Sequence, residues 1–129
     1  MSFSHLTLAT RNIRETSDFF QSTLGWEPIN RPSNAPVPTG WLKIAPGQEV
    51  HLVEIKNFEV PLLEQEFGRH IAFIHPVTDF SALKTRLIKN GAELIDPQRE
   101  TPFERLFFKD PNGYVFEIID QNRDQFSSK

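Results

Sequence analysis

Residues 3–9, Phe-Ser-His-Leu-Thr-Leu-Ala, alternate in a way that predicts a β-strand with two different faces. Residues 12–24 then carry apolar side chains at helical spacing, and this pattern stops at Gly25, a residue typical of a helix end. A strand pattern from Arg69 to Ile74 and a helical pattern that stops at Gly91 repeat this order. The repetition indicates that the chain contains two copies of one folding module.

Each module continues, after its helix, with three short strand patterns. In the first module they are Trp26 to Ile29, Trp41 to Ile44 and Val50 to Ile55. In the second module they are Glu93 to Asp96, Arg105 to Lys109 and Tyr114 to Ile119. The second helix is expected to be capped near Thr78 or Asp79. The sequence therefore predicts an α+β fold of two tandem βαβββ modules, about 1–56 and 69–121, with a linker at about 57–68 that holds a short helix.

Four residues with metal-binding side chains occupy matching places in the two modules: His5, His51, His70 and Glu117. His5 and His70 are 65 positions apart, and His51 and Glu117 are 66 positions apart, so each module carries one pair. Imidazole and carboxylate groups bind borderline and hard divalent metals, and two such pairs would complete one octahedral site with room for water or substrate. These residues are the predicted ligands of one divalent metal, and the chain is predicted to be a metal enzyme.

The predicted ligands also share a face of their strands. Residues two apart in a strand point to the same side, so His5 lies with Thr7 and away from Leu6. The other three predicted ligands are likewise placed opposite bulky apolar residues, on the face that the helix does not cover. A curved sheet with this pattern forms a cup of the kind that a small-molecule site requires. Three further side chains are candidates to line the cup and contact the substrate: Trp41, Arg105 and Phe107.

Composition and charge exclude several classes of protein. The chain has 129 residues, a net charge of −3 and no cysteine, so disulfides, thiolate nucleophiles and cysteine-ligated zinc are excluded. Lysine and arginine are scattered among acidic residues rather than forming a basic stripe, which argues against nucleic acid as a partner. No signal-peptide pattern and no apolar stretch approaching 18 residues is present, so we expect no membrane partner and a cytoplasmic location.

Four stretches of the sequence together resemble the vicinal oxygen chelate superfamily. They are His5-Leu6-Thr7-Leu8-Ala9, the helix end from Asp18-Phe19-Phe20 to Leu24-Gly25, Gly68-Arg69-His70-Ile71-Ala72-Phe73, and Phe107 to Ile118 with its Asp-Pro-Asn-Gly turn. The superfamily includes glyoxalase I, fosfomycin-resistance thiol transferases, methylmalonyl-CoA epimerase, extradiol dioxygenases and bleomycin-resistance proteins. The resemblance covers about residues 3–120.

This resemblance implies that the two modules form an incomplete barrel around a metal, usually in a homodimer. It implies that the ligands come from the first and last strands of each module, which are the positions of His5, His51, His70 and Glu117. It leaves open which of Zn, Ni, Co, Mn or Fe is bound, and whether one chain or two chains supply a site.

The sequence departs from the glyoxalase I pattern at one ligand. Those enzymes usually carry a carboxylate at the position of His51, and Glu54, the nearest acidic residue after it, is expected to point from the opposite face. His51 is the preferred fourth ligand, and Glu54 is the alternative. The stretch around Thr7 is similar to the start of the fosfomycin enzymes, where a threonine at this place lies in the active site. Their lysine, serine and arginine phosphonate-binding residues have no clear counterpart here.

The predicted site suggests a reaction. A divalent ion with open positions binds two neighbouring substrate oxygens as a Lewis acid, and Glu117 is placed to move a proton. The leading hypothesis is a glyoxalase-like lyase or isomerase that acts on a small α-oxygenated carbonyl compound or its thiol adduct. The alternatives are a fosfomycin-type thiol transferase, an extradiol-type dioxygenase and a metal-free protein that sequesters a drug. Substrate specificity is expected to reside in residues 31–38, the linker and the C-terminal tail.

Overall fold

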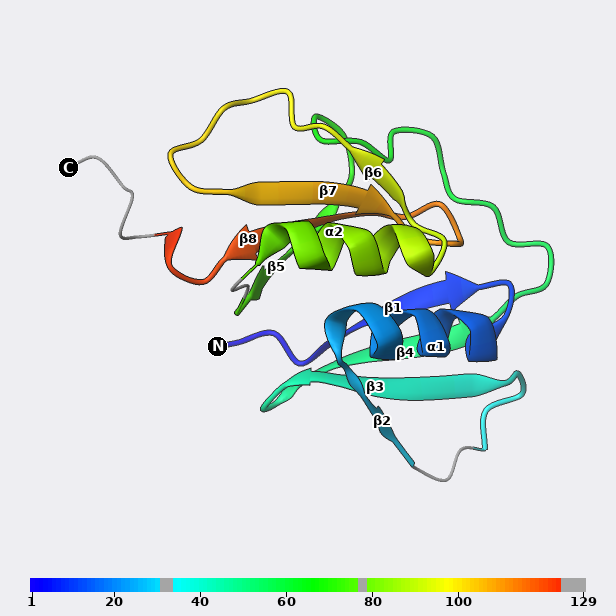
Figure 1. The fold of residues 1–129 in the computed structure, drawn as a ribbon. Coiled ribbons are helices and arrows are strands. Elements are labelled where there is room, and N and C mark those ends of the chain that lie inside the picture. Colours follow the sequence, from blue (N-terminus) through cyan, green and yellow to red (C-terminus); the bar gives the residue numbers. More distant parts are fainter. Residues whose placement is uncertain (31–33, 77–78, 124–129) are drawn as a thin grey trace. The chain divides into compact units, whose positions relative to one another are not determined.

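The computed structural model describes residues 1–30, 34–76 and 79–123, so Thr78, the C-terminal tail from 124 and part of the 31–38 loop lie outside the described residues. The chain divides into two compact units, Met1–Glu59 and Val60–Lys129. Figure 1 shows one four-stranded sheet and one helix in each unit.

The first unit is a βαβββ module. Its elements are β1 (His5–Thr10), α1 (Ile13–Leu24), β2 (Glu27–Ile29), β3 (Thr39–Ala45) and β4 (Gln48–Glu54). The strands are ordered β1-β4-β3-β2, with β1 parallel to β4 and the other pairs antiparallel. The first and last strands of the module are therefore neighbours at one side of the sheet.

The second unit repeats this arrangement. Its elements are β5 (Ile71–His75), α2 (Phe80–Lys89), β6 (Glu93–Ile95), β7 (Arg105–Lys109) and β8 (Val115–Asp120). The strands are ordered β5-β8-β7-β6, with β5 parallel to β8. The register also matches, because Thr7 lies opposite His51 in the first unit and Ala72 lies opposite Glu117 in the second. The predicted α+β class with tandem βαβββ modules is confirmed, and neither sheet is closed.

Each helix packs on the apolar face of its own sheet. In the first unit Leu8, Val50 and Leu52 are almost fully buried, together with Phe20 of α1. Along these strands, side chains point alternately to the face that the helix covers and to the opposite face, which explains the alternating sequence pattern. The corresponding buried residues of the second unit are Leu83, Leu87, Leu106, Phe108, Phe116 and Ile118. Burial of these side chains stabilises the modules by roughly 1.5–3 kcal/mol for each large apolar residue.

The helix ends follow the expected chemistry. The side chain of Asn12 accepts a hydrogen bond from the Glu15 N–H at the start of α1, and that of Asp79 accepts one from the Ala82 N–H at the start of α2. Gly25 ends α1 with φ of +71°, a left-handed conformation that glycine adopts without strain. Neither helix in the described part of the chain combines the length and the apolar character that a membrane span requires.

Two details of the prediction were wrong. Residues 57–68 contain turns and no helix; the Arg69 N–H donates to the Leu63 carbonyl, and Glu64 forms an isolated bridge with Arg69. The strand expected at 69–74 begins at Ile71, so His70 lies just before β5 rather than inside it. The folded-back segment before His70 carries the side chain of Glu66 to Arg105.

The turn between β7 and β8 contains a buried carboxyl group. Oδ1 of Asp110 accepts hydrogen bonds from the backbone N–H groups of Asn112 (3.0 Å) and Tyr114 (2.9 Å). Oδ2 is buried and has no hydrogen-bond partner among the described residues. Burial raises the pKa of Asp110 to about 6, although the hydrogen bonds from Tyr114 and Asn112 oppose the shift.

Asp110→Asn is therefore expected to change the pH dependence of stability. Between about pH 4 and 6 the folded protein holds a proton on Asp110 that the unfolded chain has lost. The free energy of unfolding of the wild type should fall, relative to the variant, by on the order of 2 kcal/mol as the pH rises through this window, and the difference should then stay constant. Urea denaturation of both proteins from pH 4 to 8 measures this. A difference that does not vary with pH would contradict the assignment.

Candidate functional site

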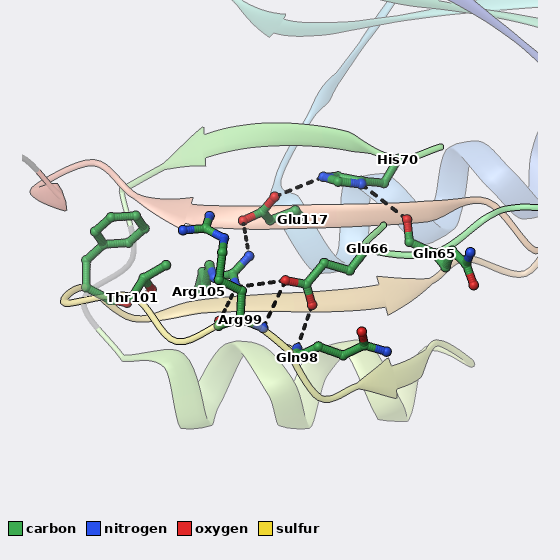
Figure 2. A network of polar contacts seen from close by, with 9 residues as sticks. Gln65, Glu66, His70, Gln98, Arg99, Thr101, Arg105 and Glu117 are labelled. Carbon is green, nitrogen blue, oxygen red and sulfur yellow. Dashed lines mark hydrogen bonds and ion pairs between the residues drawn. The ribbon is translucent and has the colours of Figure 1, made fainter. Parts of the chain in front are cut away.

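The second unit brings His70, the residue just before β5, into contact with Glu117 of the neighbouring strand β8. Nε2 of His70 lies 3.1 Å from Oε1 of Glu117, and the Nδ1–H of His70 faces the Gln65 carbonyl at 3.3 Å (Figure 2). Glu117 lies in the middle of β8 and is only 6% exposed, whereas the His70 side chain is 23% exposed. The sequence predicted that these two residues share the ligand face of the sheet, and the structure places them in direct contact.

A buried arginine holds the other oxygen of Glu117. The Nη1–H of Arg105 donates to Oε2 of Glu117 (3.1 Å), and its Nη2–H donates to Oε2 of Glu66 (2.9 Å) and to the Arg99 carbonyl (Figure 2). Glu66 also accepts the backbone N–H groups of Gln98 (2.6 Å) and Arg99 (3.2 Å). We call this group the Glu66–Arg105–Glu117 network; all three side chains are less than a tenth exposed.

Hydrogen bonds set the charge state of this network. Burial would lower the pKa of Arg105, but its hydrogen bonds to Glu66 and Glu117 outweigh burial and raise it above the usual arginine value. Burial would raise the pKa of Glu66, but hydrogen bonds from Gln98, Arg105 and Arg99 outweigh it and lower the pKa. Glu66 and Arg105 are therefore both charged at neutral pH.

The pair of His70 and Glu117 in the second unit fits a divalent cation. Two ligands at right angles, each about 2.1 Å from a metal, lie about 3.0 Å apart, which is close to the 3.1 Å between His70 and Glu117. The Gln65 carbonyl accepts from the Nδ1–H, which leaves Nε2, the nitrogen nearest to Glu117, as the atom of His70 that would hold a cation. The formal charges of Glu66, Arg105 and Glu117 sum to −1, which favours a cation.

The first-unit pair has a different geometry. The rings of His5 and His51 are stacked, with centroids 3.9 Å apart and an interplanar angle of 19°. Ring-nitrogen lone pairs lie in the ring planes, so one ring must turn before both rings can bind the same cation. Nε2 of His51 also contacts Oε1 of Glu49 at 2.9 Å, and Nδ1 of His5 contacts Oγ of Ser4 at 3.2 Å. Glu49 lies two residues before His51 and therefore adds a carboxylate to the same face of β4.

Glu54, the alternative to His51 as a metal ligand, points to the face of the sheet that α1 covers. Its Oε1 accepts a hydrogen bond from the Ile13 N–H (3.1 Å) at the first residue of α1. A carboxylate at this place satisfies a free backbone donor and interacts favourably with the positive end of the helix dipole. The position of Glu54 thus leaves His51 as the candidate on the ligand face.

The four substrate-binding candidates are distributed over both units. Thr7 and Trp41 lie on the ligand face of the first unit, where Thr7 is exposed and the Trp41 ring meets His51 edge-on at 5.6 Å. Phe107 is only 1% exposed; its ring meets His70 edge-on at 5.2 Å and lies beneath the Arg105 guanidinium. Phe107 therefore packs against the site residues.

A cavity of about 340 Å³ lies beside Arg105 in the loop between β6 and β7. Its lining residues are Pro97, Arg99, Glu100, Thr101, Phe103, Glu104 and Arg105. The loop that forms the cavity is tied to the network, because Glu66 binds the backbone of Gln98 and Arg99.

Two functional candidates, Glu49 and Glu66, were missed in the sequence. Glu49 could have been found by parity, since it shares the face of His51. Glu66 could not, because it lies in the segment interpreted as a linker and reaches Arg105, 39 residues away, only through the fold. Within either unit, the described residues contain no cluster of three or more histidine, aspartate and glutamate side chains able to hold a metal.

Comparisons with known proteins identify the class of protein. The model of the Glyoxalase/Bleomycin resistance protein/Dioxygenase superfamily matches residues 2–118, so the chain belongs to this superfamily. The resemblance inferred from the sequence motifs is confirmed. Among curated proteins, the Arabidopsis thaliana protein named Glyoxylase I 4 is 26% identical over 123 residues, which cover 91% of this chain and 69% of that protein.

Solved structures agree with this assignment. A putative glyoxalase family protein from Bacillus anthracis is 27% identical, with a TM-score of 0.70 and coverage of 93% of this chain and 94% of that chain. A mutant of the fosfomycin resistance protein FosX from Listeria monocytogenes, complexed with Mn(II) and 1S,2S-dihydroxypropylphosphonic acid, has a TM-score of 0.73 at 20% identity and covers 95% of both chains. The FosX likeness concerns the fold.

Proposed function

We propose that this protein is a metal-dependent enzyme of the glyoxalase type, a lyase or isomerase acting on a small α-oxygenated carbonyl compound or its thiol adduct. The observation that carries the proposal is the contact between His70 and a buried Glu117 whose second oxygen is fixed by Arg105. His5 and His51 complete the proposed ligand set, and the metal is one of Zn, Ni, Co, Mn or Fe. A homodimer in the cytoplasm is the proposed form of the protein.

Each residue of the proposed site has a separate role in the reaction. When bound, a divalent cation supplies Lewis-acid polarisation of the substrate oxygens. Glu117 is the proposed base that takes and returns a substrate proton, because Arg105 orients its carboxylate and the side chain is shielded from water. The Gln65 carbonyl orients His70, and the edge of Phe107 supports the ring. Thr7, Trp41 and the cavity beside Arg105 are the proposed substrate contacts.

The glyoxalase-type reaction is favoured by two relatives above 25% identity, whose names contain glyoxylase or glyoxalase. A second candidate is addition to a phosphonate epoxide, as the ligand named for the FosX structure suggests. The imidazole of His51 favours this candidate, since glyoxalase I enzymes usually carry a carboxylate there. Glu49 reduces this difference from the glyoxalase I enzymes, because its carboxylate lies on the same face of β4, next to His51.

Loading the protein in turn with nickel, cobalt, zinc, manganese and ferrous iron tests the proposal. We expect metal-dependent turnover of methylglyoxal with glutathione, and a higher rate in His51→Glu, which supplies the second carboxylate; general-base catalysis contributes typically 10²- to 10⁴-fold. Fosfomycin with thiols or water, and a catechol with oxygen, are assayed in parallel. Activity with fosfomycin alone would support the second candidate, and no metal-dependent turnover of any substrate would contradict the proposed activity.

A further inference from the structure

Arg105 contacts Glu117 through only one of its two terminal nitrogens. Nη1 donates to Glu117 at 3.1 Å, whereas Nη2 is turned toward Glu66 at 2.9 Å (Figure 2). An arginine next to a single carboxylate commonly forms two parallel hydrogen bonds to both oxygens. That arrangement would occupy Oε1 of Glu117, the oxygen that faces His70.

Glu66 has the properties needed to prevent this. Its side chain is 7% exposed, and the backbone N–H groups of Gln98 and Arg99 fix its carboxylate. It therefore offers Arg105 a competing negative charge in a set position. Glu66 also compensates one unit of positive charge close to the proposed metal ligand, where an uncompensated guanidinium would repel a cation.

We propose that Glu66 is a positioning residue: it holds Arg105 to a single hydrogen bond with Glu117 and so keeps Oε1 of Glu117 free to bind the cation. This inference rests on the proposed function. Glu66 acts only through Arg105 and touches neither the metal nor the substrate.

The test is the cation affinity of purified protein, measured by calorimetry with Mn(II) and with Zn(II). Glu66→Gln loses the charge and keeps one of the two oxygens that accept from the backbone N–H groups of Gln98 and Arg99. We expect the affinity to fall about 10-fold, the lower end for residues that support metal ligands. Glu64→Gln is the matched control. Glu64 is equally buried in the same segment and accepts hydrogen bonds from Arg69 and the Val115 N–H, but it does not contact Arg105. Its affinity should stay within about twofold of the wild type.

A double variant separates positioning from structural support. If Glu66 acts through Arg105, the further change Arg105→Met should restore most of the affinity lost in Glu66→Gln, since no guanidinium remains to occupy Glu117. If Glu66 only supports the 97–104 loop, the double variant will bind as weakly as Glu66→Gln or more weakly. Circular dichroism and thermal melting establish that each variant is folded, and Arg105→Gln replaces Arg105→Met in the double variant if the latter does not fold.

The outcomes distinguish the two proposals. A wild type whose cation binding is absent, or is unchanged by His70→Ala, overturns the proposed metal site and this inference with it. A wild type that binds through His70, together with an unchanged Glu66→Gln or an unrestored double variant, overturns the positioning role of Glu66 alone.

Discussion

Glu117→Gln is expected to abolish stoichiometric retention of the cation and to lower turnover by about 10²- to 10⁴-fold. The amide removes the negative charge of the proposed metal ligand, which is also the proposed base, while it preserves the shape of the side chain and an oxygen for Arg105. Metal affinity depends on the full set of donors, so His70→Ala should also lose the metal. Metal analysis after gel filtration in chelator-free buffer measures retention.

Folding of the Glu117→Gln variant should be largely maintained, because Arg105 keeps its ion pair with Glu66. Glu64→Gln serves again as the matched control and should retain a full equivalent of metal. If either Glu117→Gln or His70→Ala retained one equivalent, the donors would have to lie elsewhere in the chain.

Arg105→Met is expected to lower the free energy of unfolding by about 3 kcal/mol. Removal of one partner from a buried ion pair costs roughly 3–5 kcal/mol, since it leaves uncompensated charge inside the protein. We expect the lower end, because Glu66 keeps the Gln98 and Arg99 N–H groups and Glu117 keeps His70. Urea denaturation of metal-free protein at pH 7 measures the change by linear extrapolation.

Lys84→Met is the control for this experiment. Lys84 and Glu104 form an exposed pair at 3.9 Å, with side chains 43% and 56% exposed, and such pairs contribute roughly 0–1 kcal/mol. The control should therefore lose well under half of the stability lost by Arg105→Met. Equal losses in the two variants would show that the Glu66–Arg105–Glu117 network does not stabilise the fold.

Local patterns predicted most of the secondary structure. Alternation in residues 3–9 and helical spacing up to Gly25 identified β1 and α1 because both patterns report which side chains face the core. The duplicated spacing of His5 and His70 indicated two copies of one module, and the two sheets have matching registers. Predicted boundaries differ by one or two residues at several strands, as is common where strand ends fray.

The segment 57–68 shows where local patterns fail. Leu62, Leu63 and Phe67 suggested a short helix, but these residues are 65–90% exposed and bury little apolar surface. A helix this short has little stability of its own without such packing. Instead the chain turns back at Leu63, which adopts φ of +82°, and Glu64 binds Arg69 and the Val115 N–H.

The sequence by itself determined the duplicated modules and the face on which the candidate ligands lie. Strand periodicity and the spacing of the repeat can both be found from the order of residues alone. Only the tertiary structure decided what those ligands touch. The pairing of β5 with β8 brings His70 to Glu117, and the folded-back segment brings Glu66 to Arg105 across 39 residues. Contacts between residues so far apart depend on how strands pair and loops close, and the local conformational preferences of the residues do not predict them.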